Sequence, residues 1–187
     1  IRLAFALSAV LATIVRGALE LLPVLADGAF ARGAAGLGLL TAAAGAGALG
    51  AAVLKAAGLG RDPEVRGRHF AIMALGLLAV AAMGAAPSWP LALGATAVAG
   101  GAATYIAVTL QAAIQMDLSD DLRGRVMSLW TVVGFGTVAI GAFLIGALGE
   151  VTGIRAALLI SGGVGLGLLA ALALHTYVRD AVIARGP

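Results

Sequence analysis

Six long apolar stretches, separated by short polar breaks, restrict this chain to folds that place helices inside a lipid bilayer. The stretches cover residues 3–26, 34–57, 70–86, 91–114, 126–148 and 154–176. A helix of about 20 apolar residues is long enough to cross the hydrocarbon core of a membrane. Hydrophobic residues make up 61% of the chain and charged residues 11%, too few polar groups to cover a soluble domain. We therefore predict an all-α membrane protein, a single bundle of six transmembrane helices over residues 1–187.

The breaks between these stretches contain glycine, proline and charged residues, which interrupt membrane helices or resist burial. They lie at residues 27–33, 60–69, 87–90, 117–125 and 149–153.

Basic residues are distributed unequally between the two ends of the predicted bundle. One end has nine of the 12 basic residues, the other has Arg32 and Arg155, and Arg16 lies inside the first stretch. Basic residues accumulate in cytoplasmic loops, and an odd number of spans would abolish this separation. The nine are Arg2, Lys55, Arg61, Arg66, Arg68, Arg123, Arg125, Arg179 and Arg185. We therefore predict a multi-pass protein with both termini in the cytoplasm.

Arg16 and Glu20 are ionisable residues within the first predicted span. Charged groups inside a membrane are costly, and they often mark a transport pathway or a buried ion pair. Their spacing of four residues places both on one face of a helix, one turn apart. Three interpretations follow: a proton-titrating or substrate-orienting site in a central cavity, an intrahelical ion pair, or a Glu20 side chain that only reaches the outer interface.

The fourth predicted span has polar residues along one stripe. Gly100, Thr104, Gln111 and Gln115 follow one another at intervals of four, seven and four residues. Such residues either line a water-filled pathway or form hydrogen bonds between packed helices. We expect packing at Thr104, and a cavity lining at Gln111 and Gln115.

Other motifs indicate no enzyme, cofactor or metal site. Gly45–Gly50 matches the letters of a dinucleotide-binding motif, but it lies within an apolar helix, where close helix packing explains it. The two histidines lie at the ends of predicted spans, without the neighbouring carboxylates of a metal site. The basic loops are explained by topology rather than nucleic-acid binding, and Trp89 and Trp130 are expected in the interfacial belts.

The segment from Gln115 to Trp130, with the sequence Asp121-Leu122-Arg123-Gly124-Arg125, resembles the loop between helices ten and eleven of the major facilitator superfamily. The closest branch contains the enterobactin exporter and macrolide-efflux-like proteins. Glu20–Pro23 and Gly33–Gly50 are similar to that branch's seventh and eighth helices. The resemblance covers essentially the whole chain. It implies the C-terminal half of a twelve-helix bacterial exporter in the cytoplasmic (inner) membrane, whose N-terminal half we expect upstream of Ile1.

A loop motif of the same superfamily is present in altered form. Gly58 and Asp62 match its opening, but Arg66-Gly67-Arg68 falls two residues later than in the family. By resemblance, Asp62, Arg66 and Arg68 are candidates for a cytoplasmic latch between helices, together with Asp121, Arg123 and Arg125.

The resemblance implies proton-coupled export of a small amphipathic molecule, of the drug or siderophore class, by alternating access. The transport residues would then be Arg16, Glu20, Gln111 and Gln115, and the partners would be the bilayer, the missing half, the substrate and protons. An alternative is a six-helix subunit that does not transport but packs against a partner. An intramembrane enzyme is the weaker rival, because its catalytic residues are absent.

Overall fold

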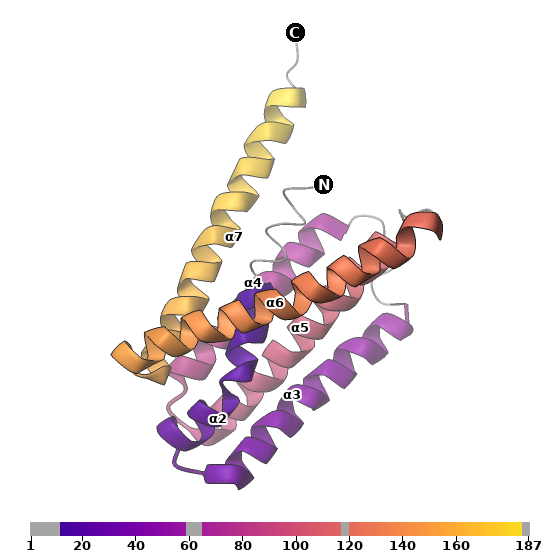
Figure 1. Ribbon diagram of the computed structural model, residues 1–187. Coiled ribbons are helices and arrows are strands. Elements are labelled where there is room, and N and C mark those ends of the chain that lie inside the picture. Colours follow the sequence, from indigo (N-terminus) through magenta and orange to yellow (C-terminus); the bar gives the residue numbers. More distant parts are fainter. Residues whose placement is uncertain (1–11, 59–64, 117–119, 185–187) are drawn as a thin grey trace.

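The structure, a computed structural model, describes residues 12–58, 65–116 and 120–184, and all regular structure in them is helical (Figure 1). Residues 12–20 are helical and precede the labelled elements. These are α2 (Leu22–Val24), the π-helix η1 (Leu25–Ala29), α3 (Gly33–Ala56), α4 (Val65–Ala85), α5 (Trp89–Met116), α6 (Asp120–Thr152) and α7 (Ile154–Ala184). The prediction of an all-α chain is confirmed for this part of the sequence.

Five of these helices are long and apolar enough to cross a membrane. They are Gly33–Ala56, Arg68–Ala85, Trp89–Ala112, Trp130–Thr152 and Ile154–His175, counted over the described residues. Each matches one of the last five predicted spans to within a few residues. The first predicted span begins in residues 1–11, which lie outside the described part.

The predicted first span is not one continuous helix. A turn at Leu21 interrupts it, and α2 then begins with Pro23 in its first positions. Proline has no backbone N–H and clashes with the carbonyl four residues earlier, so a helix is broken just ahead of it. The chain then widens into the π-helical turn η1, which continues past the predicted end at residue 26.

The helices extend further into the predicted breaks than the sequence indicated, and they do so least between α4 and α5. There α4 ends at Ala85 and α5 begins at Trp89, as the two prolines indicated. By contrast, α4 already begins at Val65 and α6 at Asp120, within the predicted loops 60–69 and 117–125. At 149–153 only Gly153 leaves the helical conformation, with a φ of 84° that glycine adopts readily.

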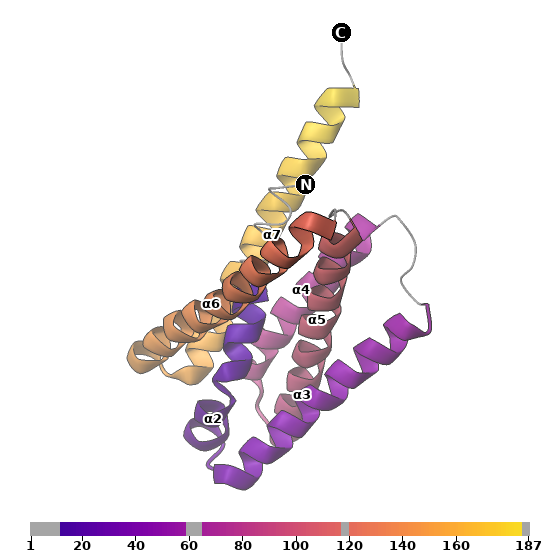
Figure 2. The same ribbon diagram turned by 45° about the vertical axis from the view of Figure 1, so that its right-hand side comes forward.

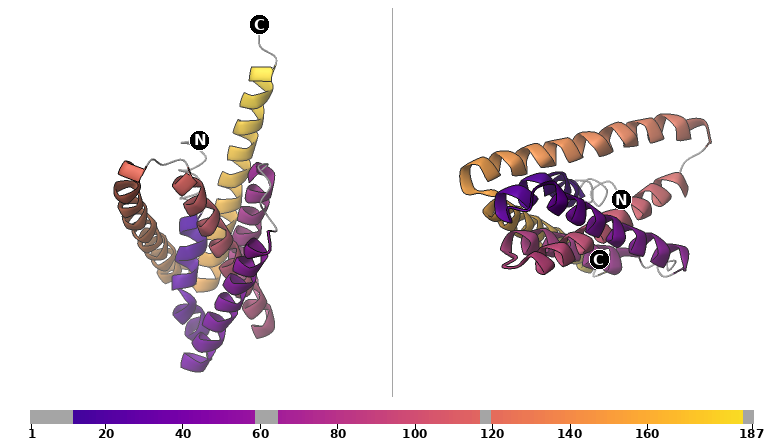
Figure 3. Two further views of the ribbon diagram at one scale, coloured as in Figure 1. Left: turned by 90° about the vertical axis from the view of Figure 1, so that its right-hand side faces the viewer. Right: turned by 90° about the horizontal axis from the view of Figure 1, so that it is seen from below.

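Helix α4 lies between α5 and α7, while α3 packs on the other side of α5 (Figures 1 and 2). The helical segment 12–20 lies between α4, α6 and α7: Val15 is close to Gly76, Gly17 to Gly141, and Ile14 to Gly165. Helix α6 lies along the face opposite α3 and α4 (Figure 3). The buried core comes from segment 12–29 and from α3 to α7, with Leu25, Leu40, Leu77, Ile106 and Leu158 almost fully buried.

Glycines bring α3 and α5 into direct backbone contact. A Cβ atom added at Gly47 would lie 1.8 Å from the carbonyl oxygen of Ala97, and one at Gly100 would lie 2.3 Å from that of Ala44. Such close approach is the usual role of small residues between membrane helices. The interpretation of Gly45–Gly50 as a packing motif is therefore confirmed at Gly47, whereas Gly45 and Gly50 face open space.

Candidate transport site

Arg16 is positioned by a tight crossing between segment 12–20 and α6. A Cβ at Gly17 would lie 2.7 Å from the backbone nitrogen of Ala142, and one at Gly141 would lie 2.5 Å from the carbonyl oxygen of Thr13. Any larger residue at these glycines would separate the two helices. The crossing therefore holds Arg16 beside the neighbouring turns of α6.

The exposed side chain of Arg16 lines a polar cleft between segment 12–20, α5 and α6. The cleft has a volume of about 180 Å³. Its other lining residues are Gln111, Trp130, Thr131, Gly134 and Phe135. Arg16 and Gln111, two residues predicted separately from the sequence, thus meet at one place. Trp130, expected in an interfacial belt, is instead half-buried in this cleft.

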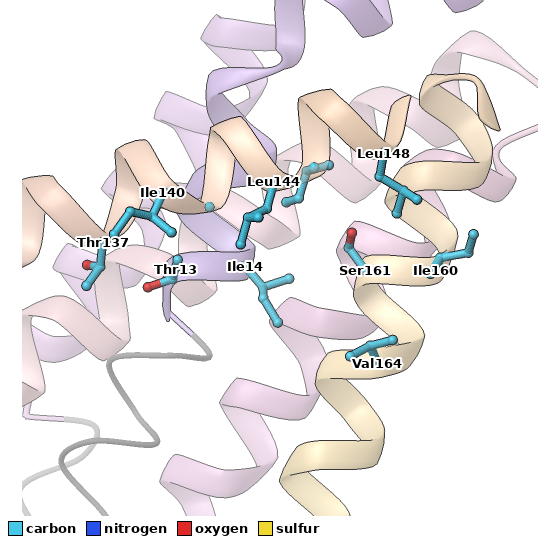
Figure 4. Close-up of a pocket in the computed structure, with 11 residues that line it drawn as sticks. Thr13, Ile14, Thr137, Ile140, Leu144, Leu148, Ile160, Ser161 and Val164 are labelled. Atoms are coloured by element: carbon cyan, nitrogen blue, oxygen red, sulfur yellow. The ribbon is translucent and has the colours of Figure 1, made fainter. Parts of the chain in front are cut away.

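On the other side of segment 12–20 lies a larger, apolar cavity, between this segment, α6 and α7. Its volume is about 450 Å³. Figure 4 shows Ile140, Leu144 and Leu148 of α6 facing Ile160 and Val164 of α7. The hydroxyl groups of Thr13, Thr137 and Ser161 also lie at its wall. The remaining wall is aliphatic or glycine, so this cavity suits the apolar part of a ligand.

A cavity of about 50 Å³ lies between the other two and shares residues with both. It has Thr137 in common with the apolar cavity, and Arg16, Trp130 and Gly134 in common with the polar cleft. We call the three together the cavity row. The cavity row is apolar at one end and cationic at the other, so it can accommodate an amphipathic molecule.

Glu20, the second ionisable residue of the predicted pair, is exposed and lies one turn beyond Arg16. Within the described part of the chain, Glu20 forms no ion pair with Arg16, and it does not line the cavity row. The alternative of an intrahelical pair is therefore not what the structure shows. A role for Glu20 in proton transfer stays a prediction.

The predicted latch residues are only partly visible. Asp62 lies outside the described residues, as do the side chains of Gln115, Arg66, Asp121, Arg123 and Arg125. The backbone shows α6 beginning at Asp120, so Asp121 lies in its first turn. Of this group, only Arg68 has a described side chain. It is half-buried on α4.

Two groups of contacts at the ends of the bundle were missed from the sequence. At the first, Lys55 of α3 donates a hydrogen bond to Thr109 of α5, and its Nζ atom lies 4.3 Å from the centre of the Tyr105 ring. The sequence does show a single lysine, Lys55, at the end of an apolar helix, and it shows Tyr105 and Thr109 four residues apart on another helix. A single sequence does not indicate that these two helices lie next to each other.

The second group lies at the other end of the bundle, and we call it the outer cluster. It brings together the segment between η1 and α3, the segment between α4 and α5, and the start of α7. Arg155 donates a hydrogen bond of 2.6 Å to the carbonyl oxygen of Ala86 and lies over the ring of Phe30 at 4.5 Å. Phe30 contacts Trp89 edge to face at 5.2 Å, and Arg32 lies over Trp89 at 4.8 Å. Trp89 is buried in this cluster, and its place in an interfacial belt stays a prediction. Arg32 and Arg155, the two basic residues at the end of the bundle opposite the other nine, thus both have partners in the structure.

Comparison with known proteins agrees with this architecture. The sequence model of a family described as a transmembrane secretion effector, within the major facilitator superfamily, matches residues 1–183. Searches of curated proteins and of solved structures gave no match.

Proposed function

Because the chain belongs to the transmembrane secretion effector family of the major facilitator superfamily, we propose that it exports a small amphipathic molecule in exchange for protons. The family is one of transporters and not of enzymes, so the chain is not an intramembrane enzyme. Family membership assigns a role in secretion or transport. The substrate class and the coupling to protons are the proposal.

The cavity row is the observation on which the proposal depends. A drug-like or siderophore-like molecule has an apolar body and a polar end that accepts hydrogen bonds. The apolar cavity between α6 and α7 would take the body, and the guanidinium group of Arg16, with Gln111 and Thr131, would bind the polar end. Few polar groups in a largely apolar site are typical of small-molecule binding sites.

We place the chain as the C-terminal half of a twelve-helix transporter. In such proteins the two halves are related by an axis along the membrane normal, and the substrate binds between them near the midplane. The cavity row would then face the other half. Rocking of the halves would expose it alternately to each side, and Glu20, close to the polar cleft, would take up and release the proton.

The rival proposal is a six-helix subunit that packs against a partner without transporting anything. It predicts that the cavity row is only a space between imperfectly packed helices. Filling the cavity row would then leave function unchanged, or would improve stability. The two proposals therefore predict different effects on efflux when one side chain is added to fill part of the cavity row.

Two glycines of α6 make this test possible. A Cβ at Gly134, which lines the polar cleft, and a Cβ at Gly136, which does not line it, would both meet no atom within 4 Å. The Cβ atom of a new side chain is thus tolerated at both positions, and the rest of a larger side chain at Gly134 would extend next to the polar cleft.

The experiment measures efflux of fluorescent amphipathic dyes from cells that express the full-length protein with Gly134→Leu or Gly136→Leu. Under the transport proposal, Gly134→Leu reduces efflux to that of cells without the protein, and Gly136→Leu retains it, at equal amounts in the membrane. Wild-type efflux in Gly134→Leu would reject the cavity row as the substrate site. No efflux of any dye by the wild-type protein would favour the rival.

A further inference from the structure

A groove lies between α3, α4 and α5. Helices α3 and α4 lie on the face of the bundle opposite α6 (Figure 3). Its volume is about 320 Å³. Most of its wall is apolar, formed by Ala51, Leu54, Ile72, Leu75, Gly101 and Ala102. Leu54 and Leu75 are 53% and 51% exposed, so the groove is open to the surroundings of the bundle.

One end of this groove is basic. Arg68 and Tyr105 belong to its lining, and Lys55 lies over the Tyr105 ring. The Nε atom of Arg68 is buried and has no hydrogen-bond partner within the described part of the chain. The same holds for both ring nitrogens of the adjacent His69. Buried polar atoms of this kind normally have a partner, and of these two residues Arg68 lines the groove, where its guanidinium group can donate to a bound acceptor.

The charges of the described residues at this end also favour an anion, because Lys55 and Arg68 are both basic. The separation of basic residues predicts that this end of the bundle is cytoplasmic, where anionic lipid headgroups attract basic residues.

We propose that this groove binds an anionic phospholipid. The phosphate would accept hydrogen bonds from Arg68, with Lys55 close by, and an acyl chain would lie along Leu54, Ile72 and Leu75. A free inorganic anion would use only the basic end and leave the apolar wall without a role. The groove shares no lining residue with the cavity row, so this lipid is distinct from a transported substrate.

The test uses the purified full-length protein, delipidated in detergent. Native mass spectrometry measures its binding of phosphatidylglycerol, with phosphatidylcholine of the same chains for comparison. Wild-type protein should bind phosphatidylglycerol more tightly than phosphatidylcholine. Arg68→Gln should weaken phosphatidylglycerol binding by about tenfold, the usual scale for losing a charge-assisted hydrogen bond. Arg185→Gln, which removes a basic residue near the C-terminus, is the control and should bind as the wild type does.

Further arms separate the alternatives. Leu75→Gln alters an exposed part of the wall at little risk to folding, and it should weaken both lipids while the headgroup preference remains. Millimolar inorganic phosphate should not displace phosphatidylglycerol. Equal binding of the two lipids, wild-type binding by Arg68→Gln, or displacement by inorganic phosphate would each overturn the proposal. None of these outcomes depends on the transport assay.

Discussion

Glu20 combines exposure with a position one turn from Arg16, within a chain segment that is otherwise almost entirely apolar. A carboxyl group in such a place is costly in a membrane unless water or a partner reaches it. Within the described residues its carboxylate forms no ion pair with Arg16, and it does not line the cavity row. Under the proposed twelve-helix arrangement, its surroundings would come from water or from the other half.

We predict that Glu20→Gln abolishes proton-driven efflux, because the amide keeps the shape of the side chain but cannot take up a proton. Efflux driven by an imposed pH gradient, measured in proteoliposomes of the full-length protein, should fall to that of liposomes without protein. Glu20→Asp retains the carboxyl group and should retain part of the flux. If Glu20→Gln transports like the wild type, the residue has no part in coupling.

At the scale of helices, substitutions at the contact between α3 and α5 can show whether the close packing of these two helices requires glycine at position 47. We predict that Gly47→Ala lowers the free energy of unfolding by about 1–3 kcal/mol, because its Cβ would overlap the carbonyl group of Ala97. Gly45→Ala is the matched control on the same helix: its Cβ meets nothing, and alanine favours the helical state.

Thermal unfolding in detergent measures both variants. The expected order of midpoints is Gly45→Ala at or above the wild type, and Gly47→Ala several degrees below it. If Gly47→Ala were as stable as the control, the backbones of α3 and α5 would have to separate at no cost.

The start of α6 is the second element that can be tested. Arg123 and Arg125 lie in its first two turns and are predicted to bind carbonyl or carboxylate groups of neighbouring helices in one conformation. Lysine keeps the charge but lacks the planar, multi-donor geometry of arginine. Arg123→Lys combined with Arg125→Lys should therefore slow transport several-fold while the topology is unchanged. Wild-type flux in the double variant would leave these arginines with a topological role alone.

For the molecule as a whole, the separation of basic residues predicts six spans with both termini in the cytoplasm. The chain has no cysteine, so single introduced cysteines report their own accessibility. Ser88 and Val151 are exposed near the outer turns and should be labelled from outside intact cells by an impermeant maleimide. Cysteines at Val65 and Ser119 should be labelled only after the membrane is permeabilised.

The neighbouring Trp89 is unsuitable as a probe, because it is buried in the outer cluster. Labelling at residue 119 from outside would contradict the six-span topology.

Much of the fold followed from local sequence, because proline, glycine and charge interrupt apolar helices in recognisable ways. The break before Trp89 is an example. The interruption at Leu21 was missed because Pro23 lies among apolar residues that read as one span. Two residues of the polar cleft were predicted: Arg16 as a charged residue inside an apolar span, and Gln111 by its place in a polar stripe along one helix. The contribution of Trp130 depends on how α6 lies across the bundle, which periodicity within a single helix does not specify.

The outer cluster has a consequence for how access to the cavity row can change. Arg155 fastens the first turn of α7 to the end of α4 and to Phe30, so the start of α7 cannot tilt without breaking these contacts. Helix α6, which forms a wall of all three cavities, joins this fastened end through Gly153 alone. A change in the angle between the two helices must therefore be absorbed at this residue, whose backbone has the widest conformational range. Gly153 would then act as the hinge about which α6 moves relative to α7.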